Sequence, residues 1–247
     1  INLLSPIINV LFVPLISYIV YPLILLCFFF KFLSPIAVFI LRYLDILNTV
    51  LAKIDFATII IPKIPILLVF VIYLFLFIFI LTKRKIFLLL VGCLLLWCKI
   101  EPKFDKSFYL YFLDVGQGDS AIMISPHQSE IVMIDTGGVA TFDNADWKKK
   151  NRVYKKTANT ISFLKSLGIK KINYLILTHG DYDHMGEANN LVEKFKVEKV
   201  IFNCGELNDL EIELMEVLDK KKTPYYYCIK ELNIDNNKLY FLKVKLT

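Results

Sequence analysis

The chain has 247 residues, of which 56% are hydrophobic, and a formal net charge of +6. This composition excludes an ordinary soluble globular protein and indicates that lipid solvates part of the chain. Residues 1–100 contain eight Lys/Arg and two Asp/Glu, whereas residues 101–247 contain 21 of each kind, so the net charge belongs to the first part. Its cations are better explained by membrane orientation than by nucleic-acid binding.

Residues 1–100 are predicted to form transmembrane helices. The segment 7–30 is uncharged and longer than the roughly 20 residues that cross a bilayer. Its two prolines are tolerated better in a membrane helix than in a soluble one. A second span is predicted over 64–82. A third apolar segment, 86–98, has only 13 residues, so it spans only if the bilayer thins or its ends snorkel.

Between the first two spans, residues 35–54 have a different character. Polar side chains such as Arg42, Asp45 and Lys53 interrupt an apolar face with helical spacing. This pattern predicts an amphipathic helix in the membrane interface. A short connector packed on neighbouring helices is an equally good interpretation.

The orientation follows from the basic cluster Lys83, Arg84 and Lys85, which separates two apolar segments. The positive-inside rule places this cluster in the cytoplasm. The chain then leaves the last segment on the outer side. We therefore expect a multi-pass protein of the cell membrane with residues 101–247 on its extracellular face.

The five cysteines show no metal-binding or disulfide framework. Three of them lie in apolar segments, while Cys204 and Cys228 are isolated in the polar part, and no CxxC occurs. Neither a zinc ribbon nor a disulfide scaffold is indicated.

From residue 108 the hydrophobic periodicity changes to that of a layered α/β domain. Strands are predicted over 109–115, 121–125, 131–134, 174–177, 200–203 and 225–229. Helices are predicted over 158–167, 185–195 and 208–221.

The segment THGDYDHMG, directly after a predicted buried strand, is the strongest chemical signal. Imidazole and carboxylate groups occupy four of six consecutive positions: His179, Asp181, Asp183 and His184. A strand end holds its loop rigidly, as metal ligation requires. Four donors in six residues suit two adjacent metals better than one tetrahedral ion. A solvated polar loop is the alternative, although two of only three histidines lie here.

This segment resembles the HxHxDH signature of the metallo-β-lactamase superfamily, with Asp181 in place of the second histidine. FLDVGQGDSAIM and IDTGG resemble its ComEC competence-protein branch, in which the hydrolase domain follows a membrane channel. NVLFVPLISYIVYPLILL is similar to the closing helices of that channel. The resemblance implies a membrane α-helical region over 1–100 and an α/β metallo-β-lactamase-like αββα sandwich over 101–247.

The resemblance also implies roles for the residues of the loop. His179 and Asp181 would ligate a first metal, and Asp183 and His184 a second. Asp183 is also expected to act in catalysis.

Three aspartates upstream are given roles as well. Asp119 of the GQGD turn would lie beside the metals as a catalytic residue, either a ligand or an orienter of ligands, and Gly116 and Gly118 would permit tight turns there. Asp135 of the DTGG turn would brace the ligand loop. Asp114 is better explained as a turn cap.

The chemistry expected of this donor set is phosphodiester hydrolysis. Two divalent ions lower the pKa of a bound water and offset the charge that develops on a phosphoryl group. Because Asp181 places a carboxylate oxygen, a harder ligand, where the signature has an imidazole nitrogen, manganese is favoured over zinc or magnesium. The resemblance implies uptake of single-stranded DNA, with this domain degrading the strand left outside.

A basic cluster supports a polyanionic substrate. Six cations with Trp147 at their edge lie within nine residues, namely Lys148, Lys149, Lys150, Arg152, Lys155 and Lys156. They are candidates for binding the phosphates of single-stranded DNA while the indole stacks on a base. A solvated basic loop is an equal alternative.

Two other functions remain open, a degenerate hydrolase domain that only binds DNA and a membrane-anchored hydrolase of a small lactone or thioester. Expected partners are single-stranded DNA, the lipid bilayer, other competence proteins and a second copy of the chain. No histidine follows His184, and His127 is expected at the surface rather than as a ligand. We therefore expect a fragment whose hydrolase domain is truncated at its C-terminus, inactive, poorly metallated and prone to aggregation.

Overall fold

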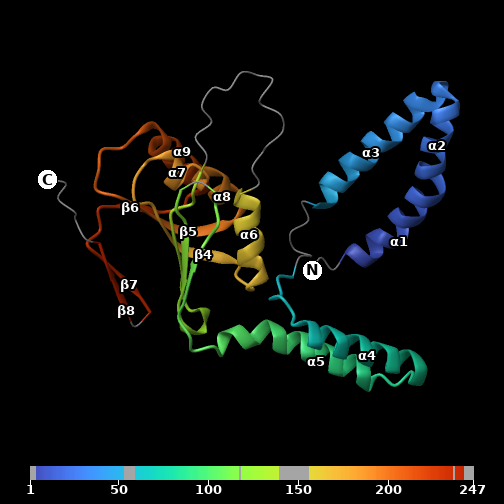
Figure 1. Ribbon diagram of the computed structural model, residues 1–247, viewed down its shortest axis with the longest axis horizontal. Helices are drawn as coiled ribbons and strands as arrows, with labels where there is room; N and C mark the ends of the chain where they lie inside the picture. Colours follow the sequence, from blue (N-terminus) through green and yellow to red (C-terminus); the bar gives the residue numbers. More distant parts are fainter. Residues whose placement is uncertain (1–3, 53–58, 117, 139–155, 236, 242–247) are drawn as a thin grey trace. The chain divides into compact units, whose positions relative to one another are not determined.

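The computed structural model describes residues 4–52, 59–116, 118–138, 156–235 and 237–241. Figure 1 shows its helices and strands in the colours of the sequence. The chain divides into two compact units, residues 1–60 and 61–247, and each unit is described by itself.

The first unit begins with a long apolar helix. Helix α1 (Ser5–Leu15), a π-helical turn and α2 (Tyr21–Phe29) follow one another without a break, giving 25 residues with the length and composition of a membrane span. In the π-helical turn Tyr21 N donates to Ile16 O, five residues back. Pro14 and Pro22 have no N–H to give to the helix, and such prolines are a known cause of local irregularity.

The second helix of this unit is α3 (Ser34–Ala52), at the place where an amphipathic helix is predicted. Residues Lys31–Leu51 are long and apolar enough to cross a membrane by length and composition. The hydroxyl of Thr49 donates to the carbonyl of Asp45, so the helix itself satisfies one of its polar groups. Together, the helices of the first unit indicate membrane association.

The second unit begins with a helical hairpin, α4 (Ile66–Thr82) and α5 (Ile86–Ile100), on either side of the basic cluster. Lys83 adopts a left-handed conformation (φ 54°) and its N–H donates to Phe79 O, which ends α4. At 1.5 Å per residue the helices are about 25 and 22 Å long, somewhat shorter than the roughly 30 Å hydrocarbon core. Helix α5 is two residues longer than the predicted segment 86–98.

The hairpin is joined to the following domain through His127. Helix α5 continues into a 3-10 turn (Glu101–Lys103), and the His127 N–H donates to Asp105 O at 2.6 Å. Its ring Nδ1 lies 2.9 Å from Lys103 O. His127 is exposed, as predicted, but it ties a turn of the sheet to the end of the hairpin. A cavity of about 230 Å³ at this junction includes none of the predicted metal ligands.

A six-stranded sheet forms the centre of the domain, in the order β1-β2-β3-β4-β5-β6. The first three strands are antiparallel, and β3 to β6 are parallel to one another. The strands are β1 (Tyr109–Phe112), β2 (Ala121–Ile124), β3 (Ile131–Ile134), β4 (Lys171–Ile176), β5 (Lys196–Phe202) and β6 (Tyr225–Tyr227). Strand β3 and the last residues of β4 and β5 are buried and apolar, which explains their short hydrophobic segments, whereas β6 at the edge of the sheet is more exposed.

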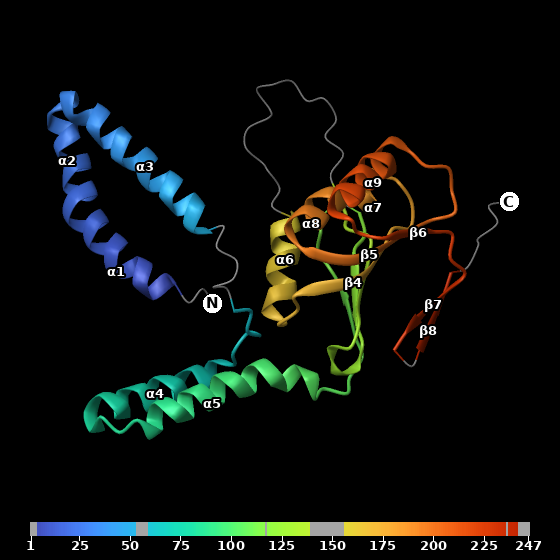
Figure 2. The ribbon, with the colours of Figure 1, turned by 180° about the vertical axis from the view of Figure 1, so that it is seen from behind.

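Different elements pack on the two faces of this sheet (Figures 1 and 2). On one face lie the helices α6 (Lys156–Ser166), α7 (Tyr182–Met185), α8 (Ala188–Lys194) and α9 (Asp209–Lys221). On the other face lies a hairpin of β7 (Glu231–Ile234) and β8 (Asn237–Tyr240). Ile234 packs there on Val132 and Ile176 of the large sheet. The predicted fold class is confirmed as N-terminal apolar helices followed by a mixed α/β domain.

Two details differ from the sequence analysis, and a third prediction cannot be compared. The helix predicted over 185–195 begins only at Ala188, as α8, because Glu187 N donates to Gly137 O on a distant turn, and the short helix α7 before it was not predicted. The β7–β8 hairpin was not predicted. The basic residues 148–155, with Trp147, lie outside the described residues, and Lys156 opens α6.

The expectation about the cysteines is wrong for one pair. Cys204 and Cys228 form a disulfide, with an S–S distance of 2.02 Å. Residue Phe202 of β5 pairs with Tyr227 of β6, and this pairing brings the two following segments together. Of the remaining cysteines, Cys27, Cys93 and Cys98 are free.

Candidate metal centre

The candidate ligand loop begins where β4 ends. Leu177 N still donates to Ile201 O, which extends the pairing with β5 by one residue. The chain then turns at Thr178, passes through Gly180 and enters the short helix α7 at Tyr182. The loop is therefore fixed at one end by the central strands and at the other by a helix.

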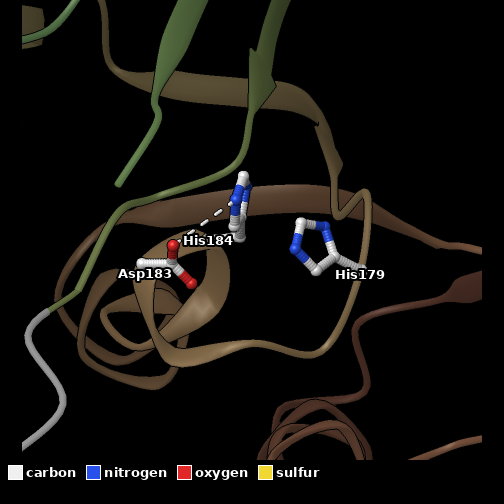
Figure 3. A group of neighbouring side chains, drawn as sticks. All are labelled: His179, Asp183 and His184. Carbon is white, nitrogen blue, oxygen red and sulfur yellow. Dashed lines mark ion pairs between the residues drawn. The ribbon is translucent and has the colours of Figure 1, made fainter. Parts of the chain in front are cut away.

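This loop brings three of the predicted ligands together. His179, Asp183 and His184 each offer one ligand atom, and these atoms lie within 4.8 Å of one another (Figure 3). The two imidazole rings are 3.8 Å apart between centroids. The Asp183 carboxylate is 3.8 Å from His184 Nε2, as the dashed line in Figure 3 marks. Within the described part of the chain, this is the one such group found.

Asp135 orients His184. Its side chain is only 4% exposed, and its Oδ2 lies 2.9 Å from His184 Nδ1. A carboxylate accepts, so Nδ1 carries the proton of the imidazole and the Nε2 lone pair is left for another partner. The positive φ of Asp135 (53°) turns the chain at the end of β3 and aims the carboxylate at the loop.

The same carboxylate reaches His179 through Thr178. Thr178 N donates to Asp135 Oδ1 at 2.9 Å, and the Thr178 hydroxyl donates to Oδ2 at 2.6 Å. The hydroxyl proton is then engaged, so its oxygen accepts from His179 Nδ1, 3.0 Å away. His179 is thereby left with a free Nε2 lone pair too. Sequence analysis gave Thr178 no role, although a hydroxyl directly before a ligand is the signal that could have shown it.

The DTGG turn holds the other end of the loop. The N–H groups of Thr136 and Gly137 both donate to His184 O, at 2.7 and 3.1 Å. A Cβ atom on Gly138 would lie 2.0 Å from Tyr182 O, so only glycine allows this approach. The GQGD turn packs as closely, since a Cβ on Gly118 (φ 83°) would lie 1.5 Å from Asp183 O.

The remaining predicted site residues lie around this group. Asp181 is at the rim, its side chain 71% exposed and its Oδ2 3.5 Å from His179 Nε2. Asp119 is exposed and lies outside the three-residue group. Asp114 accepts from Gly116 N at 3.1 Å, which is the turn-capping role expected of it. The assignments of Asp181 as a ligand and of Asp119 as a catalytic residue stay predictions.

The donor set fits a divalent cation. Two imidazole nitrogens with free lone pairs and one carboxylate oxygen converge, and a buried carboxylate fixes the tautomers of both rings. When bound, such an ion supplies Lewis-acid polarisation and a nucleophile at neutral pH. The chain's own contribution is to hold three candidate ligands and their hydrogen-bond partners in place.

The comparisons with known proteins address both parts of the chain. Residues 1–86 match the model of the competence-protein family, and residues 113–232 match that of the metallo-β-lactamase superfamily. The chain joins a ComEC-type competence domain to a metallo-β-lactamase domain. The helices α1 to α4 lie in the competence domain, and the candidate ligand loop lies in the metallo-β-lactamase domain.

One curated relative matches about two thirds of the chain. The chain is 32% identical over 174 residues to the ComE operon protein 3 of Bacillus subtilis (strain 168). The match covers 67% of this chain and 22% of the relative. The chain therefore spans about a fifth of the length of this relative.

Proposed function

We propose that the chain belongs to a DNA-uptake system of the cell membrane, and that its metallo-β-lactamase domain hydrolyses phosphodiester bonds of single-stranded DNA. The observation that supports this most directly is the grouping of His179, Asp183 and His184 in a chain with a competence domain. A metal-dependent hydrolase fold beside a competence domain favours DNA over a lactone or thioester. It also favours catalysis over mere binding, because the tautomers of both histidines are fixed for ligation.

The domain's proposed place is the extracellular face. The cluster Lys83 to Lys85 lies between the two helices of the hairpin, and the positive-inside rule assigns it to the cytoplasm. The disulfide Cys204–Cys228 supports the same orientation, because disulfides persist in oxidising compartments. Two independent features thus favour an external domain.

The proposed cofactor is a pair of divalent ions, with manganese favoured by the carboxylates Asp181 and Asp183.

The proposed contact with DNA is the basic segment 148–156, which could neutralise phosphates. Other competence proteins and a second copy of the chain are the further partners we propose. Neutralising the basic segment should weaken DNA binding and flatten its salt dependence.

The nuclease proposal is tested with the protein expressed from its complete reading frame and purified in detergent. Single-stranded DNA is incubated with Mn²⁺, and cleavage is compared for the unmutated protein and Asp183→Asn. Asp219→Asn, an exposed aspartate on α9, is the matched control. We expect cleavage that is lost in Asp183→Asn and kept in the control. DNA binding without cleavage would indicate a degenerate domain, and hydrolysis of small esters alone would indicate a different substrate.

The orientation is tested by cysteine labelling. The free cysteines Cys27, Cys93 and Cys98 are replaced by serine, and Ser129, an exposed turn residue, is replaced by cysteine. A membrane-impermeant maleimide should label intact cells. Labelling only after permeabilisation would reverse the proposed orientation.

A further inference from the structure

The start of helix α9 lies against the candidate ligand loop, although the two are far apart in sequence (Figures 1 and 2). Asn208 is the N-cap of α9, and its Oδ1 accepts from Glu211 N at 3.0 Å. The Glu211 carboxylate accepts in return from Asn208 N at 3.0 Å. This reciprocal capping box fixes the Asn208 side chain in one orientation.

The amide end of Asn208 is directed at the loop. Its Nδ2 donates to Gly180 O at 2.6 Å. Gly180 is buried, and a Cβ atom there would lie 2.0 Å from that same Nδ2. The backbone of the loop and the Asn208 side chain are therefore in direct contact, and a larger residue at position 180 would prevent it.

The buried carboxylate of Glu211 stabilises this contact by holding Asn208 in place. Glu211 is only 1% exposed, and its second oxygen accepts from Asn203 Nδ2 at 2.8 Å. Asn203 directly follows β5, the strand beside β4. Because both carboxylate oxygens are occupied, Glu211 links the end of β5 to the first turn of α9 and holds Asn208 between them.

We propose that Asn208 is a positioning residue for His179. The residue before His179 is held by Asp135 and the residue after it by Asn208, so His179 is fixed on both sides. The Asp135 contacts fix the ring, whereas the Asn208 contact fixes the backbone that carries it. This inference rests on the metal-dependent function proposed above, which it deepens.

Two substitutions at position 208 separate helix capping from loop positioning. Asn208→Ser keeps a hydroxyl that caps α9, since Ser with Glu three residues later is a preferred capping box. The serine side chain is too short to reach Gly180 O, so the contact with the loop is lost. Asn208→Ala removes both contacts. Asn233→Ser, at an exposed position on β7, is the matched control.

The first measurement is amide hydrogen exchange of the metal-free protein, expressed from its complete reading frame. In Asn208→Ser the segment 178–182 should exchange faster, by about 10-fold or more. Helix α9 should keep its protection in this variant and lose it in Asn208→Ala. Unchanged exchange of the loop in Asn208→Ser would overturn the proposal.

The second measurement is the affinity for Mn²⁺ alone, by calorimetric titration. Asn208→Ser should bind at least about 10-fold more weakly, as is typical when a partner of a ligand is removed. Affinity equal to that of Asn233→Ser would also overturn the positioning role. Failure of the unmutated protein to cleave DNA would overturn the proposed function only, because loop exchange is measured without metal or substrate.

Discussion

The two histidines of the candidate site lie in one loop but are supported differently. The His184 side chain is 17% exposed and is bonded directly to the buried Asp135. The His179 side chain is 46% exposed and reaches the same carboxylate only through the Thr178 hydroxyl. One carboxylate thus controls both rings, one directly and one through an intermediate group. Substitutions along this chain of contacts should therefore have graded effects.

The largest effect is expected for Asp135→Asn. Asparagine tolerates the positive φ of this position. Its amide has only one acceptor oxygen, so it cannot accept all the hydrogen bonds that the two carboxylate oxygens accept. Metal affinity should fall by about 100-fold, the upper end of the usual range, since both candidate ligands lose their orienting partner. Unpaired buried donors should lower the free energy of unfolding by roughly 1–3 kcal/mol.

Metal titration and urea unfolding measure the two effects of Asp135→Asn. The matched control is Asp235→Asn, because Asp235 is exposed and has nearly the same φ of 52°. If the two variants bound metal equally well, the role of Asp135 as common support would be wrong.

The next effect is expected from removal of the disulfide in a Cys204→Ser/Cys228→Ser variant. The bond closes a loop with a sequence separation of 24, so its loss should lower the free energy of unfolding by about 3 kcal/mol. The segment closed by the bond includes Asn208, and Asn203 directly precedes it, so the loop near His179 should lose more exchange protection than β3. Cys93→Ser, a free and exposed cysteine, is the control. A loss below about 1 kcal/mol would contradict this account.

A smaller effect is expected for Thr178→Val, which removes the hydroxyl with little change of shape. His179 loses its orienting acceptor, while His184 keeps Asp135. We expect metal affinity about 10-fold weaker and a loss of about 1 kcal/mol in the free energy of unfolding. Thr223→Val serves as the control. If Thr178→Val reduced the metal affinity as much as Asp135→Asn does, the two histidines would not differ in how they are supported.

The smallest effect is expected for an exposed ion pair at the start of β4, the end away from the candidate ligand loop. The loss of stability on removing this pair is a reference for the larger effects above. The Lys171 ammonium donates to Glu198 Oε1 at 2.8 Å and lowers the pKa of Glu198. Because that pKa is lowered in the folded state, the stabilisation is present above the unfolded value of about 4.3 and is lost as the pH falls through the folded value.

Lys171→Met should therefore reduce the free energy of unfolding at pH 7 by less than about 1 kcal/mol. The difference from the unmutated protein should shrink as the pH is lowered below about 4. Urea unfolding across this range, with Glu198→Gln to complete a double-mutant cycle, measures it. A difference that grew in acid would show that the pair does not act through the Glu198 charge.

Much of the arrangement could be predicted because it depends on local patterns. The hydrophobic segments of the parallel strands predicted β4 and β5, and helix α9 begins within one residue of its predicted start. The cluster of donors after β4 indicated the ligand loop. Asp135 was named because of the resemblance, and its place 2.9 Å from His184 agrees with that role.

Other features depend on contacts between distant residues, which no local pattern encodes. The capping box of Asn208 and Glu211 can be read from their spacing, but its contact with Gly180, 28 residues away, cannot. The Cys204–Cys228 pair becomes adjacent only once β6 aligns with β5. Likewise, the break between α7 and α8 depends on a hydrogen bond to Gly137.

The spacing of the site residues along the chain has a consequence for cooperativity. The three grouped ligands lie within six consecutive residues, whereas Asp135 precedes His184 by 49. Chain closure over the longer separation is entropically less favourable by about 2 kcal/mol. The group and its supporting carboxylate are therefore complete only once β3 has docked beside β4. A ligand that recognises only the assembled group would raise the melting temperature of the whole sheet, not of the loop alone.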